Sequence, residues 1–257
     1  MSFSIKLGNF LFRNFFPLYK FIYWKFKKWQ DSSEISLMKL HIRKGNVVLD
    51  IGANIGFYTT FFSMLVGVNG KVHAFEPDTV NFKYLHKETK EKTNVSINPQ
   101  AVNSTTSIIK LYRSKELNVD HRTYQPEKYE SVQEIHAVSI DDYLNSVSTE
   151  FSAVDFIKMD IQGFEMEAMK GMENTIRSNP RLKILSEFWP YGLKKSGYGA
   201  IAFFQLIESF SFDMYLIRGK KLELLTKESV VDMVDLEEAK YFNVFLKRKE
   251  NLENQSF

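Results

Sequence analysis

Residues 47–60, VVLDIGANIGFYTT, decide the fold of this chain. The stretch begins with a mostly apolar run that is too short for a helix and leads through a glycine-spaced turn into a helical pattern. A second short apolar run ends at Phe75-Glu76-Pro77, which puts a carboxylate about 20 residues after the turn. This order predicts the first β-α-β unit of a nucleotide-binding sheet, with the ligand at the turn.

The spacing of the turn separates two kinds of nucleotide ligand. A dinucleotide pyrophosphate favours G-x-G-x-x-G, whereas here Asn54 stands at the second glycine position and Asp50 closes the strand. A buried carboxylate suits a ligand with an ammonium and a sulfonium, and Glu76 can accept hydrogen bonds from both ribose hydroxyls. The motif therefore predicts S-adenosylmethionine as the cofactor. In the alternative interpretation, Gly52 and Gly56 only permit a tight turn and close packing.

Three segments in this order resemble the FkbM-type methyltransferases: LDIGANIGFYTT at 49–60, AFEP at 74–77, and VDFIKMDIQGFEMEAMKGM at 154–172. The resemblance extends over about residues 40–247, and the first thirty residues lie outside it. It implies an α/β, Rossmann-like class I methyltransferase fold, with a seven-stranded, mainly parallel sheet whose last strand is antiparallel. It also implies O-methylation of small molecules, often sugars or glycan-attached groups. Gln162 departs from the pattern, because many members carry an acid there.

The cofactor site predicted from these motifs lies around the turn and the ends of the strands. Its residues are Asp50, Gly52, Asn54, Gly56, Tyr58, Glu76, Pro77, Ala101 and Asp160.

Three acids are the candidates for catalysis. Asp160 ends a strand, Glu165 falls in the first turn of the helix that follows, and Glu187 ends the next strand, so we expect all three at the cofactor crevice. Methyl transfer needs an acceptor hydroxyl held in line and stripped of its proton, which a carboxylate can orient or accept. Two alternatives stay open: Glu165 complements the helix dipole, or the acids hold a divalent cation. We assign no metal ligand.

The rest of the chain alternates short apolar runs with helical patterns, which predicts one winding sheet. Strands are predicted near 47–51, 71–75, 94–98, 154–160, 182–187, 212–217 and 241–247, and helices near 57–66, 79–91, 164–177 and 200–209. Two further strand-like runs, 107–112 and 134–140, predict an inserted β-hairpin whose polar loop recognises the substrate or is a plain connector. We expect a catalytic domain over 41–247, a helical segment over 1–40 and a polar tail over 248–257.

The N-terminal segment differs from the rest of the chain in charge. Residues 1–30 contain six basic and no acidic residues, whereas the remainder contains 28 basic and 31 acidic ones. Ten aromatic residues lie between 10 and 29, and Pro17 predicts a helix start or a break. Arg13 and Lys20 leave no apolar run of about 18 residues, so the segment does not span a membrane. It packs on its own domain or on a second copy, or it lies on an anionic membrane surface; nucleic-acid binding is disfavoured.

The sequence thus predicts an S-adenosylmethionine-dependent O-methyltransferase that acts on a hydroxyl of a sugar, glycan-linked or other small-molecule acceptor, in the cytoplasm. The chain has no cysteine, which excludes disulfides and a thiolate nucleophile. Three alternatives stay open: a lipid or amine acceptor at a membrane surface, a non-catalytic S-adenosylmethionine-binding partner protein, and a nicotinamide oxidoreductase, against which Asn54 counts. Peripheral membrane contact through residues 1–30 and homo-oligomer formation also stay open.

Overall fold

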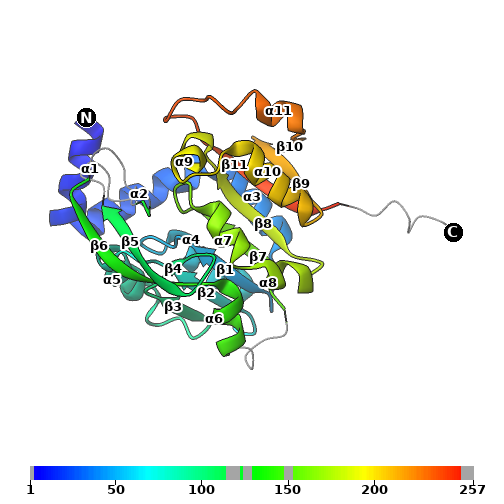
Figure 1. Cartoon of the computed structure of the whole chain (residues 1–257). Coiled ribbons are helices and arrows are strands. Elements are labelled where there is room, and N and C mark those ends of the chain that lie inside the picture. Colours follow the sequence, from blue (N-terminus) through cyan, green and yellow to red (C-terminus); the bar gives the residue numbers. More distant parts are fainter. Residues whose placement is uncertain (1–2, 114–121, 124–128, 148–152, 250–257) are drawn as a thin grey trace.

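The computed structural model describes residues 3–113, 122–123, 129–147 and 153–249 (Figure 1). Its central sheet has eight strands. They are β1 (Val47–Ile51), β2 (Lys71–Phe75), β3 (Val95–Asn98), β7 (Phe156–Met159), β8 (Lys183–Phe188), β9 (Phe212–Arg218), β10 (Lys221–Leu224) and β11 (Phe242–Arg248). The strands lie in the order β10-β9-β11-β8-β7-β1-β2-β3.

The pairing of the strands confirms the predicted sheet. β1 pairs parallel with β2 and β7, β2 with β3, and β7 with β8, whereas β11 runs antiparallel to both β8 and β9. The carboxyl ends of β1, β2, β7 and β8 therefore meet at one edge, where open α/β sheets bind their ligands. The prediction missed β10, an edge strand that pairs antiparallel with β9. All four of its residues are exposed, so it has no burial pattern that a sequence could reveal.

Helices cover both faces of the sheet (Figure 1). α4 (Phe57–Val66) agrees with the predicted bounds, and α5 (Thr79–Thr89) and α10 (Ala200–Ser209) also form where expected. β1 is fully buried, and Val48 joins the apolar cluster on one face while Leu49 joins the cluster on the other. This two-sided burial explains why the strand reads as a continuous apolar run rather than as an alternating one.

The single helix predicted over 164–177 is wrong, because the structure has two helices there. α7 (Glu165–Lys170) and α8 (Glu173–Ser178) are separated at Gly171. A Cβ atom at Gly171 would lie 2.0 Å from the carbonyl oxygen of Asn103, so the chain passes close to another backbone segment at this point. The break is therefore a tertiary effect that helical periodicity does not show. The remaining helices of the catalytic domain are α6 (Ile140–Val147), α9 (Pro190–Lys195) and α11 (Lys227–Val231).

The predicted hairpin is present and belongs to a second, smaller sheet. β5 (Ser107–Arg113) and β6 (Ser131–Val138) pair antiparallel, and β4 (Ala101–Val102) pairs parallel with β6. β6 ends two residues before the predicted strand end, because α6 begins at Ile140. Most of the loop of the hairpin, 114–121 and 124–128, lies outside the described residues, as do positions 250–257 of the predicted tail.

Three helices precede the sheet: α1 (Phe3–Asn14), α2 (Phe16–Gln30) and α3 (Ser32–His41). Pro17 lies in the first turn of α2, as predicted. The inward side of these helices packs on the catalytic domain: Phe16 stacks on Tyr84 of α5 with ring centroids 3.5 Å apart, and Lys20 forms an ion pair with Glu88 of the same helix at 2.9 Å. No helix among the described residues is long and apolar enough to cross a bilayer.

Candidate active site

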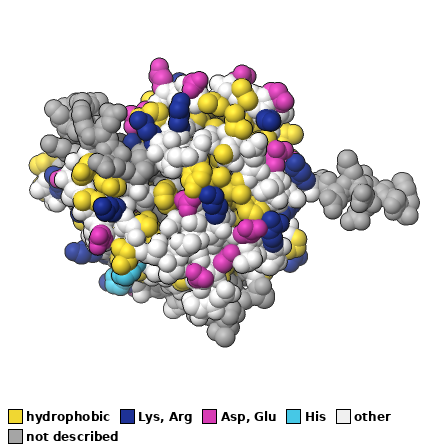
Figure 2. Space-filling view, in the orientation of Figure 1, with side chains coloured by type: hydrophobic (Ala, Val, Ile, Leu, Met, Phe, Trp, Pro, Cys, Tyr) yellow, Lys and Arg dark blue, Asp and Glu magenta, His cyan; other side chains and the backbone are white. Residues whose placement is uncertain are grey.

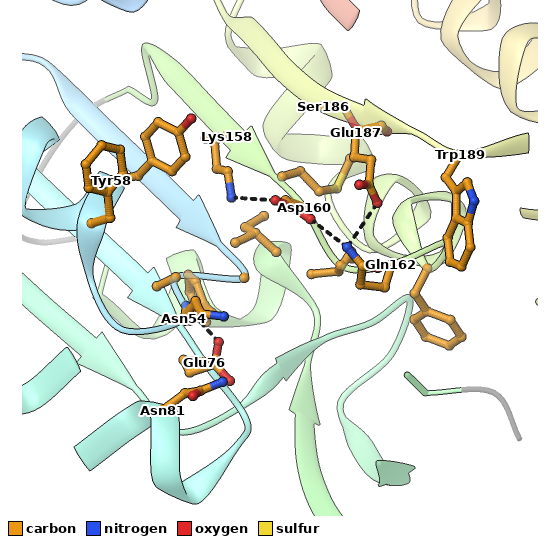
Figure 3. A pocket seen from close by; sticks show the side chains of 18 of the residues that line it. Asn54, Tyr58, Glu76, Asn81, Lys158, Asp160, Gln162, Ser186, Glu187 and Trp189 are labelled. Carbon is orange, nitrogen blue, oxygen red and sulfur yellow. Dashed lines mark hydrogen bonds and ion pairs between the residues drawn. The ribbon is translucent and has the colours of Figure 1, made fainter. Parts of the chain in front are cut away.

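A pocket of about 720 Å³ lies at the carboxyl edge of the parallel strands. Its volume is within the range of sites that hold a small-molecule cofactor or substrate. Strand ends and turns supply most of its wall, and α2 and α3 supply another part. Figure 3 shows two polar groups in this pocket: Asn54, Glu76 and Asn81 lie together, and Asp160, Gln162 and Glu187 lie apart from them toward Trp189. We refer to these as the cofactor half and the acceptor half.

The turn after β1 forms the floor of the cofactor half. Gly52 has φ +80, and a Cβ atom there would lie 2.1 Å from the carbonyl oxygen of Asp160, so only glycine fits. Asn54 has φ 51, a left-handed conformation that asparagine adopts more readily than most residues, and its Oδ1 accepts the N–H of Ile55 at 2.7 Å. The tight turn exposes backbone to the pocket without a side chain in the way.

Glu76 is fixed by backbone donors on both carboxylate oxygens. Oε2 accepts the N–H of Asn54 at 2.8 Å, and Oε1 accepts the N–H of Asp78 at 2.9 Å. Burial raises the pKa of Glu76 to about 7, although both N–H groups act in the opposite direction. The carboxylate lines the pocket, and each oxygen keeps acceptor capacity for a further donor.

The nine residues predicted to bind the cofactor divide into two groups by their position. Gly52, Asn54, Tyr58, Glu76, Pro77, Ala101 and Asp160 line the pocket. Asp50 and Gly56 do not: Asp50 lies within β1, and Gly56 faces α5, since a Cβ atom there would lie 3.1 Å from Leu85. The Asp50 side chain is fully buried and accepts the Thr59 hydroxyl on Oδ2 at 2.5 Å, whereas Oδ1 has no hydrogen-bond partner among the described residues. Burial raises the pKa of Asp50, and the positive charge of Lys158 opposes this rise.

The acceptor half contains two of the three predicted catalytic acids. The Gln162 side-chain amide donates to Asp160 Oδ1 at 3.1 Å and to Glu187 Oε2 at 3.3 Å, which ties the two carboxylates together (Figure 3). Gln162 itself has φ 58, so the loop after β7 holds it in a left-handed conformation. Gln162, which stands where many members of the family carry an acid, therefore connects Asp160 and Glu187.

Lys158 is a site residue that the sequence interpretation missed. It lies within β7 with only 8% of its side chain exposed, and its Nζ is 3.4 Å from Asp160 Oδ2. The surrounding protein disfavours a charge on Asp160, but Lys158 and Lys27 outweigh this effect and hold the pKa of Asp160 below its ordinary value. A lysine inside a short apolar strand is the signal that could have identified it, because lysine is buried only when it is paired.

Glu165 does not reach the crevice where the sequence interpretation placed it. It is fully buried and does not line the pocket; its Oε1 accepts the N–H of Ile161 at 3.0 Å. Burial raises its pKa, and the nearby negative charge of Asp160 acts in the same direction. The carboxylate folds back on the loop between β7 and α7, so it supports the loop that presents Asp160 and Gln162.

The N-terminal helices contribute side chains that the motifs did not predict. Tyr23, Lys27, Asp31 and Glu34 all line the pocket. Lys27 forms an ion pair with Asp31 at 2.6 Å, and the Tyr58 hydroxyl donates to the same carboxylate. Asp31 is the first acid in the chain and lies at the junction of α2 and α3. These residues were missed because residues 1–30 and their junction lie outside the family motifs.

Among the described residues, no group of three or more histidine, cysteine or acidic side chains is arranged to hold a metal ion. The acids of the acceptor half are instead paired with Lys158 and Gln162.

The strand order, with an antiparallel β11 between β8 and β9, and the carboxylate of Glu76 facing the glycine turn define a class I methyltransferase. The model of the Methyltransferase FkbM domain matches residues 50–220, more than half of the chain. The protein belongs to the FkbM methyltransferase family, and its cofactor is S-adenosylmethionine.

Solved structures with a similar fold include several methyltransferases. A SAM-dependent methyltransferase from Aquifex aeolicus has 16% identity and a TM-score of 0.45, with 83% of this chain and 88% of that chain covered. Precorrin-6y C5,15-methyltransferase from Geobacter metallireducens has 12% identity and a TM-score of 0.48, with 86% and 89% covered. Fibrillarin from Aeropyrum pernix, which was solved with natively bound S-adenosyl-L-methionine, has 10% identity and a TM-score of 0.45, with 83% and 73% covered.

The cofactor half fits S-adenosylmethionine. Glu76 is positioned by backbone donors to accept the two ribose hydroxyls, which is the hydrogen-bonding pattern that a diol needs. Asp50 Oδ1 is a buried acceptor with no partner among the described residues, two residues before Gly52, where a negative charge would favour the ammonium and sulfonium groups of the cofactor although Asp50 itself does not line the pocket. Gly52 leaves the space that close approach requires.

Proposed function

We propose that this protein transfers a methyl group to a hydroxyl of a sugar, glycan-linked or other small-molecule acceptor. One observation carries the proposal: Asp160 and Glu187 face the same pocket as the cofactor half, and Gln162 joins them at 3.1 and 3.3 Å. A pair of carboxylates accepts hydrogen bonds and protons, so it suits an acceptor that brings hydroxyl groups.

The two acids have different roles in this proposal. The cofactor supplies a methyl group that is bonded to a positively charged sulfur. After transfer, the sulfur is left as a neutral thioether. Asp160 stays ionised because its pKa is lowered by Lys158 and Lys27 against the effect of burial, so it orients the acceptor hydroxyl as a hydrogen-bond acceptor. Glu187, with 8% exposure, receives the hydroxyl proton as the new O–C bond forms and later passes it to water.

The same pair of acids disfavours an amine as the acceptor. Two nearby carboxylates favour the charged form of an amine, and a protonated amine has no lone pair with which to attack. A hydroxyl carries no such penalty, because it is neutral until its proton leaves. The chain also lacks the acid-or-Asn-Pro-Pro-aromatic sequence after β7 that is typical of nitrogen methylation, and has Asp160-Ile161-Gln162-Gly163 instead.

A rigid wall with polar neighbours lies beside the acids and supports an acceptor that carries several hydroxyls. Trp189 lines the pocket, and its indole Nε1 donates to the Glu238 carbonyl at 2.8 Å, which fixes the ring. The guanidinium of Arg122 lies 4.8 Å from the ring centroid and forms an ion pair with Glu238 at 3.1 Å. Because only 4% of Trp189 is exposed and Arg122 lies over its ring, the indole is a rigid wall, and an acceptor with several hydroxyls would meet the polar groups of Arg122, Asp160 and Glu187 beside it.

The proposal is tested by finding the acceptor. Protein incubated with methyl-labelled S-adenosylmethionine and extracts of its native host should label a small molecule or glycan fraction, and mass spectrometry with NMR should place the label on oxygen. A matched incubation with Glu187→Gln should give much less of the same product. A label on nitrogen or carbon would contradict the proposal, as would no labelled product from any extract while the protein binds the cofactor normally.

A further inference from the structure

The outward side of α1 and α2 is unusually apolar. Among the described residues, twenty large hydrophobic side chains are exposed, and eight of them fall between positions 7 and 29. They are Leu7, Phe10, Phe15, Leu18, Phe21, Ile22, Phe26 and Trp29. Scattered exposed apolar residues are ordinary, but such a concentration on two neighbouring helices marks a surface that another body covers.

Helical geometry places most of the α2 members on one face. Leu18, Phe21, Ile22, Lys25 and Trp29 recur at the spacings that share one side of a helix, and Trp29 is 76% exposed. We call these five residues the docking face. The opposite side of α2 carries Phe16 and Tyr23, which pack on the catalytic domain, so this packing does not explain the docking face.

Basic residues lie in and beside the docking face. Arg13, Lys25 and Lys28 are exposed, and no ion pair between described residues involves any of them. Lys20 and Lys27 point inward instead and pair with Glu88 and Asp31. Residues 1–30 contain no acid at all. The outward charge of this segment is therefore positive only.

The rest of the surface carries charges of both signs. Figure 2 shows acidic and basic side chains interspersed over the face toward the viewer, and the chain outside residues 1–30 has three more acidic than basic residues. The segment thus combines two properties, apolar exposure and unbalanced positive charge, that the catalytic domain does not share.

We propose that the docking face binds the surface of a bilayer that contains anionic lipids, with α2 lying in the plane of the interface. Phe21 and Trp29 suit the boundary between head groups and acyl chains, Leu18 and Ile22 add apolar area, and the lysine side chains extend to the anionic head groups. Lys25 already lies over the Phe21 ring, 4.4 Å from its centroid, so the cation and the aromatic ring can meet the interface together.

Other occupants of this face fit less well. A second copy of the chain bound through the same face in a symmetric dimer would bring two surfaces together whose unpaired charges, Arg13, Lys25 and Lys28, are all positive, which is repulsive. A nucleic acid would use the charges and stack on the aromatic rings, but it would leave the aliphatic Leu18 and Ile22 without a suitable contact. A bilayer accommodates aromatic, aliphatic and basic side chains at once.

Membrane binding would also place the active site at the bilayer surface. Tyr23, Phe26 and Lys27 of α2 line the pocket, so one wall of the site belongs to the helix that carries the docking face. If the proposed function is right, a hydroxyl carried on a lipid head group or a lipid-linked sugar could then reach Asp160. The docking itself does not depend on that acceptor.

Vesicle binding by the full chain tests the inference. Flotation with vesicles of phosphatidylcholine and 30% phosphatidylglycerol should carry the protein upward, and pure phosphatidylcholine vesicles should carry about tenfold less or none. Raising the salt concentration should release the bound protein, because surface charges are screened. Binding should shift the fluorescence of Trp29 to the blue, and Trp29→Phe should remove the shift, since Trp24 and Trp189 are less exposed.

Two sets of variants separate the contributions of apolar and basic side chains. The triple variant Phe21→Gln, Ile22→Gln, Trp29→Gln should lower the bound fraction at least tenfold, and Lys25→Gln with Lys28→Gln should weaken binding about fivefold per lysine. None of these residues lines the pocket. The matched control is Leu222→Gln with Leu224→Gln, which changes exposed apolar residues of β10 and should bind like the wild type. Circular dichroism and melting confirm that each variant is folded.

Three results would overturn the inference. The inference would be wrong if the wild-type protein stayed at the bottom of the gradient in the presence of anionic vesicles at low salt. Equal losses in the triple variant and in the β10 control would show that the docking face has no special role. Concentration-dependent dimers that the triple variant abolishes, without vesicle binding, would assign the face to a second copy. Because none of these measurements requires turnover, they fail independently of the proposed methyl transfer.

Discussion

The two halves of the pocket hold their carboxylates by different means. In the cofactor half, Glu76 accepts backbone N–H groups from Asn54 and Asp78. In the acceptor half, Asp160 is held by side chains, the Gln162 amide and the Lys158 ammonium. Backbone donors come with the turn and change only if the fold changes, whereas side-chain partners can be replaced one at a time. The cofactor half is thus a property of the fold, and the acceptor half is where the chemistry can vary.

The two halves also differ in electrostatics. Burial raises the pKa of Glu76 to about 7, because no cation in direct contact offsets the loss of water. Asp160 has two lysines near it that outweigh the effect of burial, and its pKa lies below the ordinary value. Protonation near neutral pH should therefore affect cofactor binding, whereas Asp160 keeps its charge.

Of the substitutions in the two halves, we expect the largest effect at Asp160, and we expect it on turnover. Asp160→Asn keeps the size of the side chain but removes the charge that we propose orients the acceptor hydroxyl, so we expect kcat to fall about 10²-fold or more. The dissociation constant of S-adenosylmethionine should change by less than about threefold, because Glu76 and the β1 turn are untouched. Steady-state kinetics with the identified acceptor and calorimetry with the cofactor give the two numbers. Equal losses in turnover and cofactor affinity would move Asp160 into the cofactor half.

At Glu76 we expect a smaller effect, and we expect it on the affinity for the cofactor rather than on turnover. Glu76→Ala removes both acceptor oxygens for the ribose, so the dissociation constant of S-adenosylmethionine should rise by between about tenfold and 10²-fold. The ligand-free protein should still unfold cooperatively, since the surrounding turn keeps Gly52 and Asn54. Calorimetry measures the affinity, and Glu91→Ala, at an exposed glutamate on the surface, is the matched control. Unchanged affinity in Glu76→Ala would remove this residue from the ribose site.

The same difference between the halves explains what the sequence could predict. Gly52, Asn54 and Gly56 have positive φ values, which only a few residue types accept, so the turn leaves a clear trace in the sequence. Seven of the nine residues predicted to bind the cofactor line the pocket, and their role there stays a prediction. Seven strands could also be predicted, since their apolar runs are buried on one or both faces.

The acceptor half could be predicted only in part, for physical reasons. Helical position placed Glu165 near Asp160, but it could not show that the side chain turns back to the N–H of Ile161. Gln162 and Lys158 are polar residues whose role depends on a neighbour in space, Glu187 or Asp160. Asp31 reaches the pocket through the packing of α2 and α3 on the catalytic domain, which no local pattern encodes.

The third prediction uses the raised pKa of Glu76. Ribose hydroxyls donate hydrogen bonds, so the cofactor prefers the ionised carboxylate, and binding must release the proton that Glu76 holds below its pKa of about 7. The dissociation constant should fall about tenfold from pH 6 to pH 8 and level off above. Calorimetry across this range in the wild type and in Glu76→Gln gives the test, and the slope should vanish in the variant. A slope that persists in Glu76→Gln would show that another group titrates.

The smallest effect is expected at Glu165, and it concerns stability rather than function. The folded protein holds the proton of Glu165 more tightly than the unfolded chain does, because burial raises its pKa. Its contribution to stability is therefore complete below the ordinary pKa of glutamate and is lost as the pH rises through the higher folded-state value. Glu165→Gln keeps an oxygen for the Ile161 N–H and cannot ionise, so the variant should be more stable than the wild type at pH 8, by about 1–3 kcal/mol, and similar to it near pH 4. Urea unfolding at both pH values measures the difference.

Two results would contradict this interpretation of Glu165. A variant that loses as much stability with rising pH as the wild type would show that Glu165 is not the titrating group. A large loss of turnover with unchanged stability would return Glu165 to the acceptor half.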